Sequence, residues 1–185
     1  MTAVHDALPD AYQEMVSLGA GCGLRQGEIF ELAVEDIDFL GGTVHVVRQV
    51  KLLRGTQAVF GPPKGGKERR VSLPETVSFA LAAHITKHEP VDVTLPWKTP
   101  DGPPVTASLI FANVKNKDLA LHRTRFNRYV WRPALTSAGI PLGRENGMHA
   151  LRRFYASVLL RAAVDRVFRD PDTTEDGPGT AHGVS

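Results

Sequence analysis

Two segments that lie far apart in the sequence carry cationic side chains suited to binding a phosphate. Residues 23–28 contain Arg25, and residues 147–157 contain His149 and Arg152. On a helix, residues three positions apart face the same way, so His149 and Arg152 share one side. A guanidinium stays charged and offers two parallel N–H donors to phosphate oxygens, and an imidazole exchanges a proton near neutral pH. The pattern favours chemistry on a phosphodiester.

Breaking a DNA phosphodiester without a metal sets three requirements. Cations must neutralise the non-bridging oxygens, a donor must protonate the departing 5′-oxygen, and a nucleophile must lie in line with it. Arg25 and Arg152 suit the first requirement because guanidinium pairs with phosphate through charge-assisted hydrogen bonds. We take these two arginines as the candidates for holding the phosphate.

The segment that carries His149 and Arg152 divides into two faces when it is drawn as a helix. The charged face also holds Arg153. The opposite face holds Leu151, Phe154, Tyr155 and Val158. An amphipathic pattern of this kind predicts a helix that lies against the core. We therefore expect Tyr155 to be a core residue that points away from both His149 and Arg152.

Helices are expected to make up most of the body that positions these residues. Apolar residues at helical spacing precede the glycines at 19, 21 and 23, which should end a first helix. The remaining predicted helices cover residues 24–32, 75–88, 119–135 and 148–167, with a Pro/Gly-rich loop at 96–104. The sheet is expected to be a small antiparallel meander inserted in this helical body, with strands at 43–50, 57–60 and 69–73.

Length and composition indicate one globular domain. The chain has 185 residues, of which 42% are hydrophobic, and this is enough for one core but hardly two. We expect the domain to span residues 1–168, followed by a disordered tail at 169–185 that is poor in large apolar residues. The single cysteine, Cys22, excludes an internal disulfide and is expected to be buried and inert. No segment predicts a signal peptide or a membrane span.

The net charge of +2 conceals an uneven distribution along the chain. Residues 115–169 carry 12 Lys and Arg against 3 Asp and Glu, whereas residues 1–114 carry 10 against 13. A concentrated positive block is what a polyanion partner requires, because phosphate neutralisation supplies most sequence-independent affinity for nucleic acid. The alternative is a solvated basic surface.

Three blocks of the sequence together resemble the catalytic domain of the tyrosine recombinases, the phage integrase family. They are Gly-Leu-Arg-Gln-Gly-Glu at 23–28, the lysine-containing segment 63–74, and His-Ala-Leu-Arg at 149–152. They occur in the family's order over residues 11–165, which makes the match more specific than any single motif. The resemblance implies an α+β fold that is mainly α, a helical integrase-like domain with a three-stranded antiparallel sheet.

The same resemblance implies roles for four residues. Arg25 and Arg152 would stabilise the phosphorane, Lys64 would protonate the leaving 5′-oxygen from a β-hairpin, and His149 would assist proton transfer. Family members use neither metal nor other cofactor, so none is expected. The composition of the segment alone favours the alternative that Lys64 is a solvated lysine of the hairpin.

Two departures from the family pattern stand out. The family usually has histidine directly after its second arginine, where this chain has Arg153. The family also places a Leu-Gly-His-like box and then the nucleophilic tyrosine downstream, but the chain has only Tyr12, Tyr129 and Tyr155. We therefore expect no nucleophile in this chain and interpret the chain as the product of a frameshift, a truncation or a degenerate copy.

Further basic residues are candidates for contacts with the DNA backbone. Lys67 and Arg70 flank the predicted hairpin, and Arg153 lies beside the second arginine. Three arginines at helical spacing, Arg125, Arg128 and Arg132, could form a phosphate-contacting ridge. A solvated helix face explains these three equally well. His84 and His88, one helical turn apart, have no third ligand nearby in the sequence, so no metal site is expected.

The function expected from these residues is a site-specific recombination or integration module that binds DNA and clamps the scissile phosphate. Its partner would be a double-stranded DNA attachment site, with other recombinase protomers, and no membrane or small-molecule substrate. A cytoplasmic, nucleoid-associated location would follow. The first alternative is a non-catalytic DNA-binding remnant of an integrase, and the second is an unrelated basic RNA-binding protein or metal-dependent nuclease.

Overall fold

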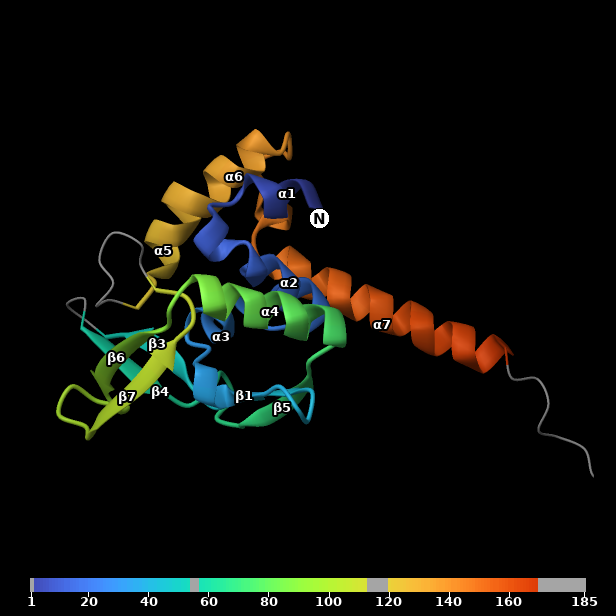
Figure 1. The fold of residues 1–185 in the computed structure, drawn as a ribbon. Helices are drawn as coiled ribbons and strands as arrows, with labels where there is room; N and C mark the ends of the chain where they lie inside the picture. The colour runs from blue at the N-terminus through green and yellow to red at the C-terminus, as the bar shows by residue number, and fades with distance from the viewer. Residues whose placement is uncertain (1, 54–56, 113–119, 170–185) are drawn as a thin grey trace, which may run out of the picture.

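The computed structural model describes residues 2–53, 57–112 and 120–169, which form short helices packed beside three small sheets (Figure 1). The helical elements are α1 (Thr2–Ala7), η1 (Asp10–Tyr12), α2 (Glu14–Gly21), α3 (Gln26–Phe30), η2 (Val34–Asp36), α4 (Glu75–Lys87), α5 (Arg123–Phe126), the π-helical η3 (Asn127–Trp131), α6 (Arg132–Ser137), η4 (Arg144–Asn146) and α7 (His149–Arg169). The predicted helices correspond to α2, α3, α4, the run from α5 to α6, and α7, whereas α1 and the short turns η1, η2 and η4 were not predicted. The mainly helical α+β class is confirmed. The expected tail began at Arg169, which the structure places at the end of α7, and the rest of it lies outside the described ranges.

The sheets differ in detail from the single predicted meander. The strands are β1 (Ile37–Asp38), β2 (Thr43–Val46), β3 (Gln49–Leu52), β4 (Ala58–Gly61), β5 (Arg69–Ser72), β6 (Val91–Pro96) and β7 (Pro104–Leu109). They form a three-stranded sheet in the order β1-β2-β5 and two hairpins, β3-β4 and β6-β7, all antiparallel. The hairpin β6-β7 was not predicted, and the loop expected at 96–104 is its connection.

The predicted strand over residues 43–50 is two strands, because extended pairing is interrupted at Val47 and Arg48. The Arg48 guanidinium donates two hydrogen bonds to the buried Asp36 carboxylate, at 2.6 and 3.0 Å. After this break β2 pairs with β5, whereas β3 pairs with β4. The interruption separates the sheet β1-β2-β5, to which the strand beginning at Arg69 belongs, from the hairpin β3-β4.

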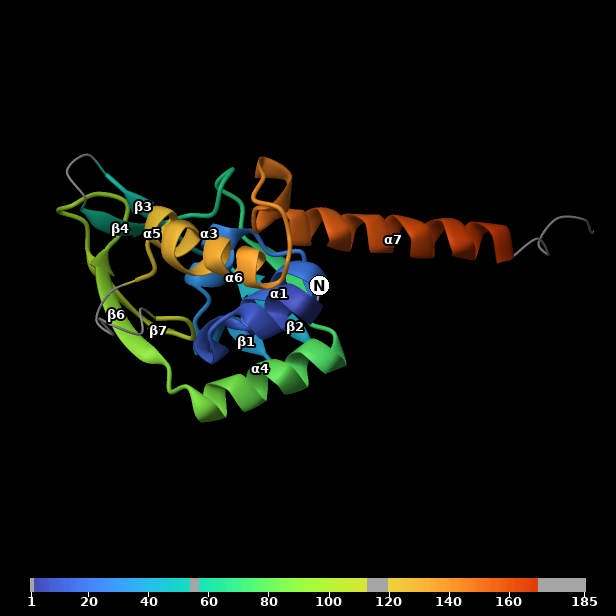
Figure 2. The same ribbon diagram turned by 90° about the horizontal axis from the view of Figure 1, so that it is seen from above.

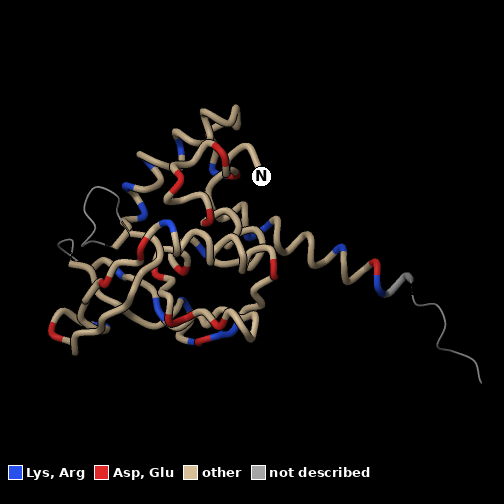
Figure 3. The backbone as a smooth tube through the Cα atoms, in the orientation of Figure 1, with Lys and Arg blue, Asp and Glu red and all other residues tan. Residues whose placement is uncertain are grey.

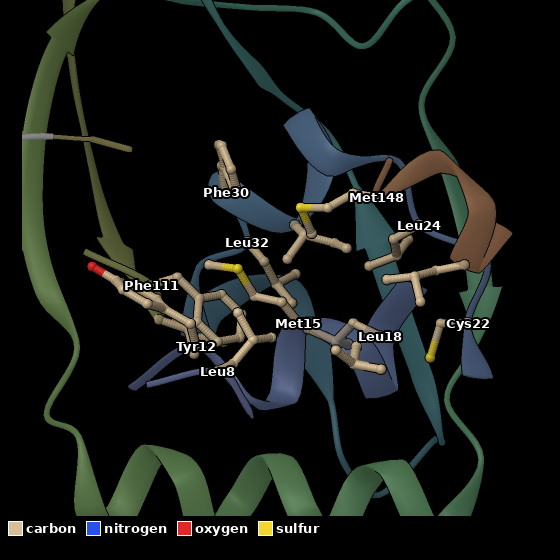
Figure 4. Packing of buried hydrophobic residues seen from close by; sticks show 14 of the residues in the cluster. Leu8, Tyr12, Met15, Leu18, Cys22, Leu24, Phe30, Leu32, Phe111 and Met148 are labelled. Atoms are coloured by element: carbon tan, nitrogen blue, oxygen red, sulfur yellow. The ribbon is translucent and has the colours of Figure 1, made fainter. Parts of the chain in front are cut away.

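The main core surrounds α2. Met15 and Leu18 are fully buried and pack with side chains from the loop after α2 and from the start of α7, as Figure 4 shows for Leu24 and Met148. Cys22 is buried here, as expected, and desolvation raises the pKa of its thiol to about 12. A second cluster lies where the hairpins β3-β4 and β6-β7 meet, and consists of Ala33, Phe60, Val93, Ala107 and Leu109.

Helix α7 packs on the body only through its first turns and then extends away from it (Figures 1 and 2). Leu151 is buried against Gly19 of α2, where an added Cβ would lie 2.8 Å from the Leu151 side chain. Small residues allow such close helix contacts, and the absence of a side chain at Gly19 sets the approach of the two helices. No helix among the described residues is long and apolar enough to cross a membrane.

Candidate nucleic-acid interface

Arg25 lies in the tight connection between α2 and α3. Gly23 makes the turn with a φ of +64°, a conformation that residues with a Cβ rarely adopt. Arg25 then occupies the position before the first turn of α3, and its backbone N–H donates to Glu28 Oε2 at 2.8 Å. A glutamate at the third helical position commonly caps the N-terminus in this way. The Arg25 side chain is 43% exposed, so its cationic head faces solvent.

Glu28 joins this turn to the β5 strand. Its side chain is 4% exposed and receives two hydrogen bonds from Arg69, at 2.8 and 2.7 Å, and one from Arg25 Nη1 at 2.9 Å. Burial disfavours the charged form of Glu28, but the hydrogen bonds from Arg69 and Arg25 outweigh it and lower the pKa of the carboxyl. The same ion pair raises the pKa of Arg69.

Arg152 approaches the same turn from the second turn of α7. Its Nη1 donates to the Gly23 carbonyl oxygen at 2.7 Å, two residues before Arg25. Desolvation and the neighbouring Arg25 charge lower the pKa of Arg152, and both effects disfavour the cation. Two guanidinium groups thus lie together with one carboxylate nearby, and an anion bound between them would relieve their repulsion. We call Arg25, Arg152, Glu28 and Arg69 the arginine cluster.

The other sequence-predicted residues of the catalytic set are exposed, on segments that lead into this cluster. His149 is the first residue of α7, one turn before Arg152. Lys64 is exposed in the turn between β4 and β5, directly after the fully buried Pro63. The turn leads into Arg69, which binds Glu28, so the segment that carries Lys64 is attached to the arginine cluster at its end.

The predicted backbone-contacting residues divide into two groups. Lys67 and Arg70 are exposed near the start of β5, and strand alternation places Arg70 on the side opposite Arg69. Arg153 is also exposed, but its Nη2 donates to the Glu145 carbonyl at 2.5 Å. Arg153 therefore holds the η4 turn, which leads into α7.

Of the arginine ridge predicted on residues 125, 128 and 132, two arginines line a groove and one does not. Arg128 and Arg132 do line an open groove of about 680 Å³, but together with Arg123, Thr124 and Asn127. The lining runs from α5 through the π-helical η3 to the first residue of α6. Arg125 is exposed outside the groove lining. Figure 3 shows the basic positions that follow one another along α5, η3 and α6.

The groove is joined to the arginine cluster by a side-chain hydrogen bond. Gln26, the residue after Arg25, donates its Nε2–H to Asn127 Oδ1 at 2.6 Å. Asn127 belongs to the groove lining. The cationic groove and the phosphate-binding candidates are therefore neighbouring parts of one surface.

The expectation for Tyr155 was wrong. Tyr155 is only partly buried, and its ring packs directly against the backbone at Gly23, where a Cβ would overlap it. Phe154 and Val158 are 48% and 46% exposed, so of the predicted apolar face only Leu151 is buried. The physical reason is that α7 leaves the body after its first turns. Tyr155 lies near Arg152, and its phenol contributes to the electrostatics of that guanidinium.

The two histidines predicted one helical turn apart, His84 and His88, lie at the C-terminal end of α4. His84 is buried, and its ring lies 4.8 Å from that of His88 and 5.0 Å from that of Phe111. His88 Nε2 is 2.6 Å from an Asp10 carboxylate oxygen. Desolvation and the neighbouring His88 lower the pKa of His84. Among residues 2–53, 57–112 and 120–169, no three metal-ligating side chains are grouped suitably for an ion.

Comparison with known proteins assigns the family. The model of the "Phage integrase family" matches residues 1–168, so the chain belongs to this family. A putative prophage phiRv2 integrase of Mycobacterium tuberculosis is 32% identical over 88 residues, which cover 48% of this chain and 24% of the relative. The chain thus matches only a quarter of the length of this relative.

Solved structures share the fold at low sequence identity. The Tn1549 transposon integrase in complex with transposon right end DNA has a TM-score of 0.67 and 18% identity, covering 82% of this chain and 46% of that one. The XerA recombinase has a TM-score of 0.59 and 20% identity, covering 88% and 47%. The chain spans less than half the length of both structures.

Proposed function

We propose that this chain binds double-stranded DNA and grips one backbone phosphate for site-specific recombination of the integrase type. The observation that carries the proposal is the meeting of Arg25 and Arg152 at the Gly23 turn. Two fixed guanidinium groups are suited to a phosphate whose negative charge grows in the transition state. Membership of the phage integrase family supports this function, and the relatives in complex with DNA show the same fold.

In the proposed mechanism, each of four side chains has one task. Arg25 and Arg152 neutralise the non-bridging oxygens, and Lys64 protonates the 5′-oxygen as it leaves. His149, exposed at the start of α7, assists the proton transfer. The partly desolvated setting of Arg152 strengthens its attraction for an anion, because its charge is less well solvated by water.

Contacts with the rest of the duplex would come from the basic residues around the arginine cluster. The groove lined by Arg123, Arg128 and Arg132 is adjacent through the bond between Gln26 and Asn127. Lys67, Arg70, Arg125 and Arg153 are exposed and would add to the positive field. Such contacts position the protein on the backbone and make binding sensitive to salt.

None of the three tyrosines is proposed as the nucleophile. Tyr12 is buried and donates to the Ala112 carbonyl, Tyr129 is exposed beside Arg128, and Tyr155 packs on Gly23. Strand cleavage would then use a tyrosine other than these three, such as one from another recombinase protomer, and the alternative function is that of a non-catalytic DNA-binding remnant. A location with the DNA of the nucleoid follows from this proposal.

Two measurements on the purified chain test the proposal. In a gel-retention assay, we expect the chain to bind a mixed-sequence duplex with an affinity that falls steeply as salt rises. Arg25→Ala should weaken binding about fivefold and lower the slope of log K against log salt by about one. Binding that is absent at low salt, or unaffected by Arg25→Ala, would contradict the proposal.

Denaturing gels with a nicked duplex address the nucleophile. We expect no covalent protein–DNA band from this chain alone. A band that disappears in Tyr155→Phe would instead assign Tyr155 as the nucleophile, and a band that persists would assign another group. The wild-type chain and the variant share the same charge, so differences in binding do not confuse the result.

A further inference from the structure

Glu28 is saturated with hydrogen bonds. Each carboxylate oxygen accepts two: Oε1 from Arg25 Nη1 at 2.9 Å and Arg69 Nη1 at 2.8 Å, and Oε2 from the Arg25 backbone N–H at 2.8 Å and Arg69 Nη2 at 2.7 Å. An ionised carboxylate has about four acceptor positions in total. With Arg69 in place, Glu28 has no capacity for a second bond from the Arg25 guanidinium.

This saturation determines how much of Arg25 is free. A guanidinium carries five N–H donors, and Arg25 gives one of its own to Glu28. The others have no hydrogen-bond partner within the described ranges, and the side chain is 43% exposed. Without Arg69, the Arg25 guanidinium would be free to turn and bind Glu28 through two parallel bonds, which is the preferred geometry of an arginine–carboxylate pair. Its donors would then be turned away from a phosphate.

Arg69 also connects two parts of the site that are distant in sequence. It begins β5, where it pairs with Val46, and it follows the turn that carries Lys64 by five residues. Its partner Glu28 lies in α3, directly after the Arg25 turn. One bidentate ion pair therefore holds the lysine-bearing turn and the arginine-bearing turn together.

We infer that Arg69 is a positioning residue, which occupies Glu28 so that Arg25 presents its free donors to the phosphate, and which does not itself bind DNA. The inference rests on the proposed function. The side chain of Arg69 is 31% exposed, and both of its terminal nitrogens are directed to Glu28.

A second-site rescue separates positioning from direct contact. We expect Arg69→Gln to weaken binding of a mixed-sequence duplex about fivefold and to lower the salt slope by about one, as Arg25→Ala does. Adding Glu28→Gln should restore the slope and most of the affinity, because a neutral amide no longer captures Arg25. A residue that contacts phosphate directly, or one needed only for folding, would not be rescued in this way.

The matched control is the second bidentate pair of the fold. Arg48 donates two hydrogen bonds to Asp36, whose side chain is 7% exposed, and this carboxylate binds no other arginine that is a candidate for the phosphate. Arg48→Gln removes the same charge and a similar buried pair. We expect it to lower the melting temperature while leaving the salt slope unchanged, and Arg69→Lys, which keeps the charge, covers the case in which Arg69→Gln fails to fold.

Arginine side-chain NMR gives a readout that does not depend on DNA. In Arg69→Gln, rotation about the Arg25 guanidinium bonds should slow and its Nη signals should separate, and in the double variant they should merge again. Signals of Arg25 identical in the wild type and in Arg69→Gln would overturn the inference even if no duplex binds. Loss of binding in Arg69→Gln that persists in the double variant would overturn it as well.

Discussion

Glu31 is the residue whose ionisation most directly links pH to the stability of this fold. The side chain is buried one turn after Glu28, accepts a hydrogen bond from the Val50 backbone N–H, and leaves Oε2 without a hydrogen-bond partner. Desolvation raises its pKa to about 8, and the neighbouring Glu28 charge acts in the same direction. Glu31 is therefore protonated at neutral pH in the folded protein.

This raised pKa predicts that the protein loses stability as pH rises from about 5 to 8. In that window the unfolded chain, with an ordinary glutamate pKa of about 4.3, has released a proton that the folded state still holds. The stabilising contribution is complete below the unfolded pKa and is lost as pH rises through about 8. In Glu31→Gln, thermal melts should therefore depend much less on pH over this range.

The exposed Glu89 gives the control for this measurement. Glu89→Gln makes the same substitution at an exposed position, and its melting temperature should follow that of the wild type at each pH. Parallel curves for the wild type and Glu31→Gln would show that Glu31 ionises normally in the folded state.

Among single residues, those of the site that belong to local motifs were predicted from the sequence, and those that depend on distant partners were missed. Arg25 and Arg152 were predicted from motifs, and the structure places them together. The spacing of Glu28, three residues after Arg25, was a local signal for the capping bond that the structure shows. The ion pair between Glu28 and Arg69 joins residues 41 positions apart, and no local pattern predicts such a pairing.

Among the elements, the α2–α3 turn has the strictest geometric requirement. A side chain at Gly23 would be strained for two reasons. The φ of +64° is one that residues with a Cβ rarely adopt, and the Cβ would overlap the ring of Tyr155. Gly23→Ala should destabilise the fold by about 2–4 kcal/mol, the sum of backbone strain and overpacking. It should also weaken duplex binding, because the Gly23 carbonyl holds Arg152. Urea denaturation and the gel-retention assay measure the two effects.

Gly27 provides a matched substitution four residues later. A Cβ there meets no atom within 4 Å, and the residue lies inside α3. Gly27→Ala should be neutral or should stabilise the protein by up to about 1 kcal/mol, because alanine favours the helix. If the two alanine variants unfolded at the same urea concentration, the turn would not have the requirement assigned to it.

Helices were easier to predict than strands in this chain. The 3.6-residue periodicity of α4 and α7 is a local property, and both were predicted to within about two residues. The split between β2 and β3 depends on the bond from Arg48 to Asp36, which joins different elements. The groove along α5, η3 and α6 is lined by Arg123 and not by Arg125, which the spacing of the three predicted arginines did not indicate.

Over the whole molecule, α7 is the element that exposes a run of large apolar side chains. The basic residues of α5, η3 and α6 and the arginine cluster lie on the body, whereas α7 extends outward (Figures 1 and 3). Beyond its first turns α7 exposes apolar side chains, namely Phe154, Val158, Leu159, Leu160 and Val164 at 44–66%. Exposed apolar side chains in this number favour association in water.

We therefore expect the purified chain to self-associate as its concentration rises. Leu160→Lys combined with Val164→Lys places two charges one turn apart on α7, where lysine is a good helix former. The variant should remain monomeric in sedimentation velocity at concentrations where the wild type associates, with unchanged helix content by circular dichroism. Ala162→Lys with Ala163→Lys adds the same charge to exposed positions of the same helix but removes no large apolar side chain, so this control should associate like the wild type. Equal association of both lysine variants would mean that net charge, and not the apolar surface of α7, governs the behaviour of the molecule.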